Sequence, residues 1–246
     1  MNETLRLLHT HRSERSYKSD PIPEALLEQI LEAARRAPSS KNTQQISVIV
    51  VRDAARRSRI AEYAGGQSWI AQAPVFLAIV LDLNKTRVGL EKTGVRQETQ
   101  HSVEALVCAA TDAGIALEAM ALAARSLGLG IVPIGGIRRS PDKMVELLEL
   151  PEYTFPLVGL VLGYVDEPAT QKPRLPMSAF RHEEKYQPER LRPAIDQYDE
   201  ELMRYWKEIG RTDGLPWSEN TALSYKMVYY PKVKPVAARQ GFTCED

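Results

Sequence analysis

Two short basic motifs, far apart in the sequence, hold the side chains best suited to binding an anion. The first is His11-Arg12-Ser13-Glu14-Arg15 and the second is Lys172-Pro173-Arg174-Leu175-Pro176. The guanidinium group of arginine is planar and permanently charged, so it pairs well with a phosphate. In an extended segment residues two apart face the same side, so Lys172 and Arg174 can reach one ligand. Either motif alone is typical of a solvated basic face, but the two together favour a site.

Serine and glycine residues supply further candidate contacts to a ligand. Ser39 and Ser40 lie in a polar loop, and Gly65-Gly66-Gln67 follows a predicted helix. Gly135-Gly136 follows a predicted short strand and, lacking side chains, would let backbone N–H groups approach a bound molecule closely. These residues complement the basic motifs with uncharged hydrogen-bonding groups.

The usual nucleotide-binding loops are absent from the sequence. Gly128-Leu129-Gly130 lacks the third glycine of a Rossmann fingerprint and follows a predicted helix rather than a strand. No Walker lysine motif is present either. A nicotinamide cofactor, if used, is therefore not expected in a Rossmann crevice.

No set of side chains suggests acid–base, nucleophilic or metal chemistry. His9 and His101 have no partners at metal-ligand spacing, so we expect no metal. Cys108 and Cys244 are far apart, which favours a reducing compartment over a disulfide framework, and Cys108 is expected to be an inert core residue. No catalytic side chain is assigned.

Composition limits the classes of partner. The chain has 246 residues, 43% hydrophobic and 26% charged, with a formal net charge of zero, so we expect no nucleic-acid partner. The first twenty residues contain no apolar signal-peptide core, and we find no apolar run of about 18 residues. The sequence predicts a cytoplasmic protein with no membrane partner.

Hydrophobic periodicity predicts alternating helices and strands. Helices are expected at 3–9, through the apolar stripe from Leu27 to Ala34, and at 54–63, 97–127, 141–148 and 193–209. Strands are expected at 46–51, 74–83, 131–134 and 155–162. We place a core domain at residues 1–178 and a C-terminal extension at 179–246, with Trp217, Tyr229 and Tyr230 as aromatic anchors.

The predicted helix at 97–127 is the longest element and would span roughly 45 Å at 1.5 Å per residue. It is apolar on most faces from Val103 onward, with one stripe through Val103, Leu106, Val107 and Ala110. Such a helix should be buried on more than one side, as a central helix or at a subunit interface. In the first helix, Leu5 and Leu8 are expected on the apolar side.

Taken in order, these motifs resemble the nitroreductase and flavin reductase family, and within it the NfsA-like branch of oxygen-insensitive NADPH nitroreductases. The resemblance covers nearly the whole chain. The matching motifs are His-Arg-Ser-x-Arg at 11–15, the serine pair at 39–40, Gly-Gly-Gln at 65–67, Ile-Gly-Gly at 134–136, Lys-Pro-Arg-Leu-Pro at 172–176 and His-Glu-x-x-Tyr-Gln at 182–187.

The resemblance implies an α+β nitroreductase fold. Its central sheet is mostly antiparallel and flanked by helices, with a long central helix at a dimer interface. The C-terminal extension would wrap the partner subunit of a homodimer. In this family the serine loop usually serves the site from the partner subunit, so a complete site would need two chains.

The resemblance also implies FMN as the cofactor. The basic side chains would offset the charge of the phosphate and of the reduced ring. His11 is expected to contact the flavin, whereas His182 is expected to order the start of the extension. The implied FMN-binding residues are His11, Arg12, Ser13, Arg15, Ser39, Ser40, Gln67, Pro133, Ile134, Gly135, Gly136, Lys172 and Arg174.

The implied activity is a ping-pong oxidoreduction. NADPH, or NADH, reduces FMN, and small-molecule acceptors such as nitroaromatics, quinones or free flavin then take two electrons. The chain departs from the branch at Pro133, where an aromatic residue is usual, and at Ile209, where an arginine often grips the NADPH 2′-phosphate. Arg211 and Lys207 flank Ile209 and could substitute. A fold relative acting in dehalogenation or flavin breakdown, and a non-catalytic flavin carrier or sensor, remain as alternatives.

Overall fold

The computed structural model describes residues 1–245, and contacts within the chain divide it into two compact units. The first unit comprises Met1–Ala169 together with the chain from Tyr230 onward, and the second is Thr170–Tyr229. Each unit is described by itself. The division into a core of 1–178 and an extension of 179–246 that wraps a partner stays a prediction.

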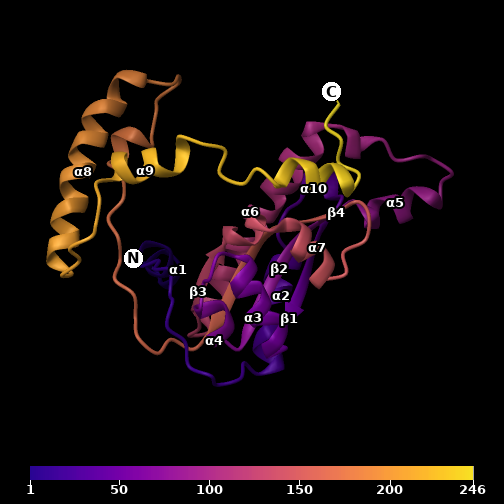
Figure 1. The fold of residues 1–246 in the computed structure, drawn as a ribbon, viewed down its shortest axis with the longest axis horizontal. Coiled ribbons are helices and arrows are strands. Elements are labelled where there is room, and N and C mark those ends of the chain that lie inside the picture. The colour runs from indigo at the N-terminus through magenta and orange to yellow at the C-terminus, as the bar shows by residue number, and fades with distance from the viewer. Residues whose placement is uncertain (246) are drawn as a thin grey trace. The chain divides into compact units, whose positions relative to one another are not determined.

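A four-stranded antiparallel sheet forms the centre of the first unit (Figure 1). Its strands are β1 (Ile46–Val51), β2 (Val75–Asp82), β3 (Gly130–Ile134) and β4 (Thr154–Gly163), in the order β1-β2-β4-β3. The β-branched segments that predicted strands therefore do form them. The bounds of β1 match the prediction, and the ends of the other three strands differ from it by one residue.

One face of the sheet is covered by three helices of the first unit. These are α3 (Ala54–Tyr63), α4 (Trp69–Gln72) and α7 (Pro141–Leu147). Phe76 and Val161, which are fully buried, point to this side and pack among the apolar residues of these helices. Helices α3 and α7 were predicted, whereas the short α4 was not.

The opposite face is covered by α2 (Glu24–Arg35) and α6 (Val103–Ser126). Leu77 and Leu160, both fully buried, pack against the apolar stripe of α2 and the inner face of α6. Because β2 is buried on both faces, its sequence is a continuous apolar run rather than an alternating one.

Helix α6 begins later than predicted. Ser102 caps its N-terminus by accepting a hydrogen bond from the Glu104 N–H, and Thr99–His101 forms a separate 3-10 turn. The helix therefore has 24 residues and a length of about 36 Å rather than 45 Å. A serine cap outweighs the helical pattern of the preceding residues, because it satisfies N–H groups that have no partner within the helix.

Within one chain, the apolar stripe predicted for α6 does not face the sheet. Val103 and Val107 are 46% and 53% exposed in the chain, and the face against the sheet consists mostly of alanines between Ala105 and Ala124. Ile115 is exposed as well. Helix α6 therefore keeps an apolar outer face within one chain.

By length and composition α6 is also able to cross a membrane, although our reading of the sequence found no such segment. In the structure it packs against α2 and the sheet. Cys108 lies on this helix, partly exposed rather than in the core as predicted. Its thiol contacts a carboxylate oxygen of Glu104 at 3.0 Å, which raises the pKa of Cys108.

Helix α1 (Glu3–His9) packs on α6, and the Arg125 side chain donates a hydrogen bond to the Leu7 carbonyl. Leu7 is the buried residue, whereas Leu5 and Leu8 are 44% and 39% exposed. The apolar side predicted for this helix therefore faces outward.

Two further helices of the first unit were not predicted: α5 (Leu83–Glu91), which follows β2 directly, and α10 (Val233–Arg239) near the C-terminus. A third apolar cluster packs Phe242 and Val236 against Phe155 at one end of the sheet. The end of the chain is thus part of the first unit rather than a loose tail.

The second unit is built on α8 (Leu191–Glu208), which was predicted, and α9 (Trp217–Tyr225), which was not. Tyr198, Leu202 and Trp206 form the buried face of α8. Tyr229, predicted to be an anchor, is 64% exposed. Two 3-10 turns, Met177–Ala179 and Pro188–Arg190, precede α8, and in this segment the His182 Nδ1 accepts the Gln187 N–H at 3.1 Å.

Candidate functional site

Glu14 fixes the first basic motif beside the sheet. Its backbone N–H donates to the Ile131 carbonyl of β3 at 3.0 Å, and its buried carboxylate accepts the Ala169 N–H at 2.7 Å. The Tyr17 hydroxyl donates to the Glu14 carbonyl at 2.9 Å. Burial, reinforced by the charge of Glu14, raises the pKa of Tyr17, so this phenol stays a hydrogen-bond donor.

The two arginines of the motif are held in place while remaining exposed. Arg12 Nη1 donates to the Ala169 carbonyl at 3.2 Å, and Arg15 Nη1 donates to the Ser13 carbonyl at the same distance. The Arg15 guanidinium lies 5.4 Å from the centre of the Trp69 ring. Arg12 Nε also lies 3.6 Å from the Glu14 carboxylate, so Arg12 is partly neutralised by an acid. Both cations are oriented by the chain and exposed. Ser13, between the two arginines, and His11, just before them, are half-buried.

The glycine turn lies against Gln67. Ile134 ends β3, and Gly135 and Gly136 begin the 3-10 turn Gly135–Arg139. A Cβ atom on Gly136 would lie 2.4 Å from Gln67 Nε2 and 2.6 Å from the Ala64 carbonyl oxygen, so only glycine fits there. Gln67 Nε2 donates to the same carbonyl at 2.8 Å.

Trp69 joins this turn to the first motif. It follows Gln67 by two residues and carries the Arg15 guanidinium over its ring. Its indole N–H is buried and has no hydrogen-bond partner among the residues that the structure describes. Pro133 is exposed on β3, where the missing N–H of proline is tolerated near a sheet edge.

The serine loop lies on the opposite side of the sheet from the glycine turn. It leads from α2 to β1, and the Ser40 N–H donates to Asp112 on α6, so it lies on the α2–α6 side of the sheet. Gly136 and Gln67 lie on the other side, among the residues of α3 and α4. Within one chain, the predicted site residues of the first unit therefore form two separate groups.

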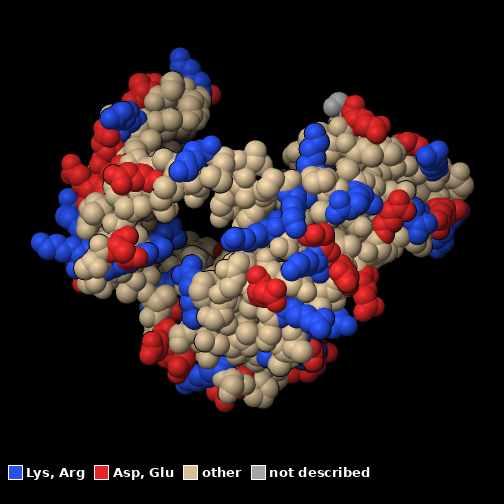
Figure 2. All heavy atoms as spheres, viewed as in Figure 1, with Lys and Arg blue, Asp and Glu red and all other residues tan. Residues whose placement is uncertain are grey.

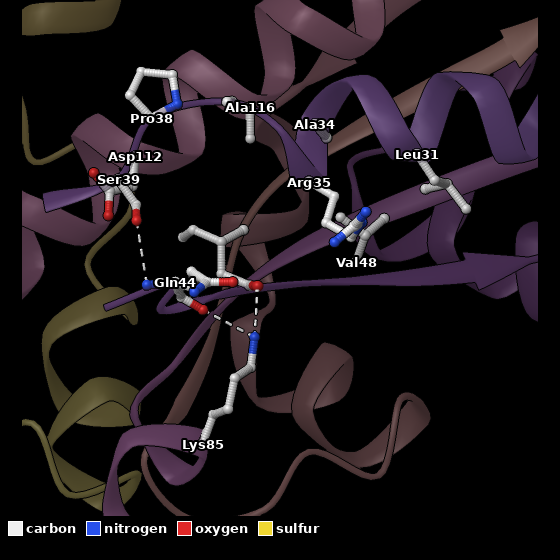
Figure 3. A pocket seen from close by; sticks show the side chains of 12 residues that line it. Leu31, Ala34, Arg35, Pro38, Ser39, Gln44, Val48, Lys85, Asp112 and Ala116 are labelled. Carbon is white, nitrogen blue, oxygen red and sulfur yellow. Dashed lines mark hydrogen bonds between the residues drawn. The ribbon is translucent and has the colours of Figure 1, made fainter. Parts of the chain in front are cut away.

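A pocket of about 290 Å³ opens beside the serine loop (Figure 3). Ser39, Gln44, Lys85 and Asp112 form its polar wall, and α2 and β1 supply its apolar wall. The Gln44 N–H donates to the Ser39 hydroxyl oxygen at 3.2 Å, which folds the loop back on itself. Neither Asp112 nor Lys85 was singled out from the sequence, since their partners lie far away along the chain.

The second basic motif is fixed on α8 within the second unit. The Tyr198 hydroxyl donates to the Pro173 carbonyl at 2.9 Å, and Lys172 Nζ lies 5.3 Å from the centre of the Trp206 ring. Lys172 and Arg174 are exposed and line a pocket of about 490 Å³ together with Arg204 and two carboxylates, Glu201 and Glu208. Both cations can therefore reach one ligand there.

The predicted donor-binding residues also lie in the second unit. Arg211 Nε donates to the Asp213 carboxylate at 2.8 Å, which lowers the pKa of Asp213, and the guanidinium lies 4.6 Å from the centre of the Trp206 ring. Lys207 is exposed in the last turn of α8. Arg211 is thus already paired with an acid, whereas Lys207 lies at the surface.

The face of the molecule drawn in Figure 2 has no broad patch of a single charge. Acidic and basic side chains are interspersed over the face in Figure 2, in line with the net charge of zero. In the part of the chain that the structure describes, no group of three or more His, Cys, Asp or Glu side chains is arranged to hold a metal. The exposed basic side chains of the two motifs are suited to binding a small anionic ligand.

Comparisons with known proteins agree with this arrangement. The model of the nitroreductase family matches residues 8–164, and that of the nitroreductase family C-terminal domain matches 172–245. The chain therefore belongs to the nitroreductase family. Its fold, an antiparallel sheet flanked by helices with a C-terminal domain, is the one the resemblance implied.

Relatives match over their full lengths. "FMN reductase [NAD(P)H]" of Bacillus subtilis is 44% identical, with all of both chains covered. "Oxygen-insensitive NADPH nitroreductase" of Salmonella typhimurium is 36% identical, with 98% of this chain and 99% of the relative covered. The solved structure of B. megaterium NfrA2 superposes with a TM-score of 0.97 at 42% identity, covering both chains completely. The predicted placement in the NfsA-like branch is confirmed.

The glycine turn gives a direct test of this geometry. Gly136→Ala should destabilise the fold by about 1–3 kcal/mol, because the new methyl group overlaps Gln67 and a backbone carbonyl. Gly135→Ala is the matched control, since its Cβ would meet only the flexible end of Arg138, at 3.3 Å. Urea unfolding of both variants measures the difference. Equal stabilities would contradict the close approach at Gly136.

Proposed function

We propose that this protein is an FMN-dependent NAD(P)H oxidoreductase that passes two electrons, by a ping-pong route, to nitroaromatics, quinones or free flavin. The observation that carries the proposal is the pair of exposed guanidinium groups, Arg12 and Arg15, fixed beside β3, the strand that leads into the Gly136 turn. The full-length relatives named as an FMN reductase and an NADPH nitroreductase support it.

The residues present fit FMN. Its phosphate requires cations, and its ring requires a flat approach without side chains, as at Gly135 and Gly136. The unpartnered indole N–H of Trp69 is a further donor at this place. The proposed FMN contacts are His11, Arg12, Ser13, Arg15, Gln67, Pro133, Ile134, Gly135 and Gly136 in the first unit, Lys172 and Arg174 in the second, and Ser39 and Ser40 from another chain.

FMN, when bound, supplies the redox chemistry, accepting a hydride from NAD(P)H and releasing two electrons to an acceptor. The role of the chain is to bind and orient the cofactor and to stabilise negative charge. Arg12 and Arg15 serve this role through fixed guanidinium groups, which need no reorganisation as charge develops. No side chain has to transfer a proton as a general acid.

A homodimer would complete the site. The serine loop and the Gly136 turn lie on opposite sides of the sheet in one chain, so a second copy is the natural source of Ser39 and Ser40. The outer face of α6 offers an apolar surface for that contact through Val103, Val107 and Ile115. We place the reaction in the cytoplasm, with small-molecule partners and neither nucleic acid nor membrane.

The electron donor would be held in part by the second unit. Arg211 and Lys207 are the proposed partners of the NADPH 2′-phosphate. Because Arg211 is paired with Asp213, its net attraction for a phosphate is reduced, and Ile209 adds none. We therefore expect both NADPH and NADH to serve, with NADPH somewhat preferred.

The central test is anaerobic reduction of the purified, FMN-loaded protein. NADPH or NADH should bleach the flavin absorbance, and a nitroaromatic should then restore it. Comparison of the two donors gives the cofactor preference. Bound FMN that neither nicotinamide bleaches would instead indicate a flavin carrier or a fold relative of different activity.

Removing one guanidinium should weaken cofactor binding. Arg15→Ala is expected to raise the Kd for FMN by about tenfold to a hundredfold, because one charge-assisted contact is lost. Arg59→Ala is the matched control, an exposed arginine on α3 outside the proposed site. Fluorescence titration of the apoproteins measures both values, and the same Kd in both variants would count against Arg15.

The proposed dimer is tested on α6. Val107→Glu places a charge on the exposed apolar face and should shift the protein from dimer to monomer, with FMN affinity falling at the same time. Val88→Glu is the control, a valine exposed to a similar degree on α5. Sedimentation velocity reports the oligomeric state. A Val107→Glu variant that remains dimeric would remove this face from the interface.

A further inference from the structure

The serine loop has a backbone that its own sequence does not favour. Lys41, Asn42 and Gln44 have φ angles of 50°, 57° and 51°, in the left-handed region. Residues with side chains adopt this region at a cost, and Lys41 and Gln44 lack the special tolerance of asparagine. Such a conformation persists when the surrounding structure holds it.

Asp112 holds one end of this loop. Its carboxylate accepts the Ser40 N–H at 3.1 Å and 3.3 Å through its two oxygens, and the Gln45 side-chain amide at 3.1 Å. The Asp112 and Gln45 side chains are both buried, with exposures of 4% and 7%. The middle of α6 is thereby tied directly to the residue that follows Ser39.

Lys85 holds the other end. Its Nζ donates to the carbonyl oxygens of Gln44 and Ile46, each at 2.9 Å (Figure 3). The Ser39 hydroxyl accepts the Gln44 N–H between these two anchors. Helices α6 and α5 therefore fix the loop from opposite ends, and Figure 3 shows both anchors bordering the same pocket.

The buried charge explains why an aspartate is suited to this position. No arginine or lysine of the described chain forms an ion pair with Asp112 within 4.0 Å, so N–H donors supply the compensation that the structure shows. A buried carboxylate is costly without such donors, and opening the loop would remove the Ser40 N–H. The Ser40 hydroxyl oxygen lies 3.8 Å from the Cys108 thiol, which donates to it, so the hydroxyl proton is the group that Ser40 can offer to a ligand.

We propose that Asp112 is a positioning residue of the FMN site: it fixes the serine loop so that the Ser39 and Ser40 hydroxyls are presented to the cofactor of the partner subunit. Lys85 supports the same loop from its other end. This inference rests on the proposed function. Asp112 itself acts through the loop rather than by touching the cofactor.

The test measures FMN affinity of the full-length apoprotein by fluorescence titration. Asp112→Asn keeps the shape but loses the charge and one acceptor, and should raise the Kd by about tenfold. Glu28→Gln, an exposed carboxylate on α2 and outside the apolar face of α6, should leave it unchanged. If Asp112→Asn does not fold, Lys85→Met replaces it, since Lys85 is at the surface and its loss should also raise the Kd severalfold.

A double-mutant cycle separates positioning from general stability. With both serines replaced by alanine, Asp112→Asn should have little further effect on the Kd, because the hydroxyls it positions are gone. If the changes in the Kd for FMN simply add, or if Asp112→Asn leaves the Kd unchanged, the positioning role of Asp112 is overturned. FMN binding by the unaltered protein would still support the proposed function in that case. Failure of the unaltered protein to bind FMN would instead overturn the proposed function.

Discussion

The close packing of α6 on the sheet is the constraint on which most of the first unit depends. The inner face of the helix is rich in alanine, and small side chains let the helix backbone approach the strands closely. That approach brings Asp112 to the serine loop and turns Val107 outward. One helix thus covers the sheet, anchors a loop and leaves an apolar face.

Two buried carboxylates have similar roles on the two sides of the sheet. Glu14 holds the basic motif by accepting the Ala169 N–H, and Asp112 holds the serine loop by accepting the Ser40 N–H. In both cases a side chain accepts a backbone N–H from a segment outside the α-helices and strands, Ser40 being the first residue of the 3-10 turn Ser40–Asn42. The scaffold supplies ordered loops in this way, and the loops carry the groups suited to a ligand.

The strands and most helices could be predicted because their signals are local. The β-branched run Ile46–Val51 forms a strand with the predicted bounds, and Tyr198 and Leu202 lie on the buried face of α8. The outward orientation of Val107 was not predictable, because an apolar side chain does not reveal which of two surfaces will cover it. The same holds for Leu5.

The basic motifs were identified from residue types, but their supports were not. Glu14 and Asp112 accept hydrogen bonds from residues 155 and 72 positions away along the chain. Their role in holding loops therefore depends on the tertiary fold and is not visible in the local sequence. Arg15 was predicted as a ligand contact, whereas its stacking on Trp69 became visible only in the structure. Which FMN contacts each residue makes remains the proposal given above.

The contact between Glu14 and β3 also bears on solubility. An edge strand with free N–H and carbonyl groups is a template for aggregation, and the Glu14 N–H occupies the Ile131 carbonyl on the edge of β3 that β4 does not pair. The segment that presents Arg12 and Arg15 therefore also shields the sheet. Substitutions that loosen this segment would expose a strand edge, so residues 11–15 also protect the chain from aggregation through β3.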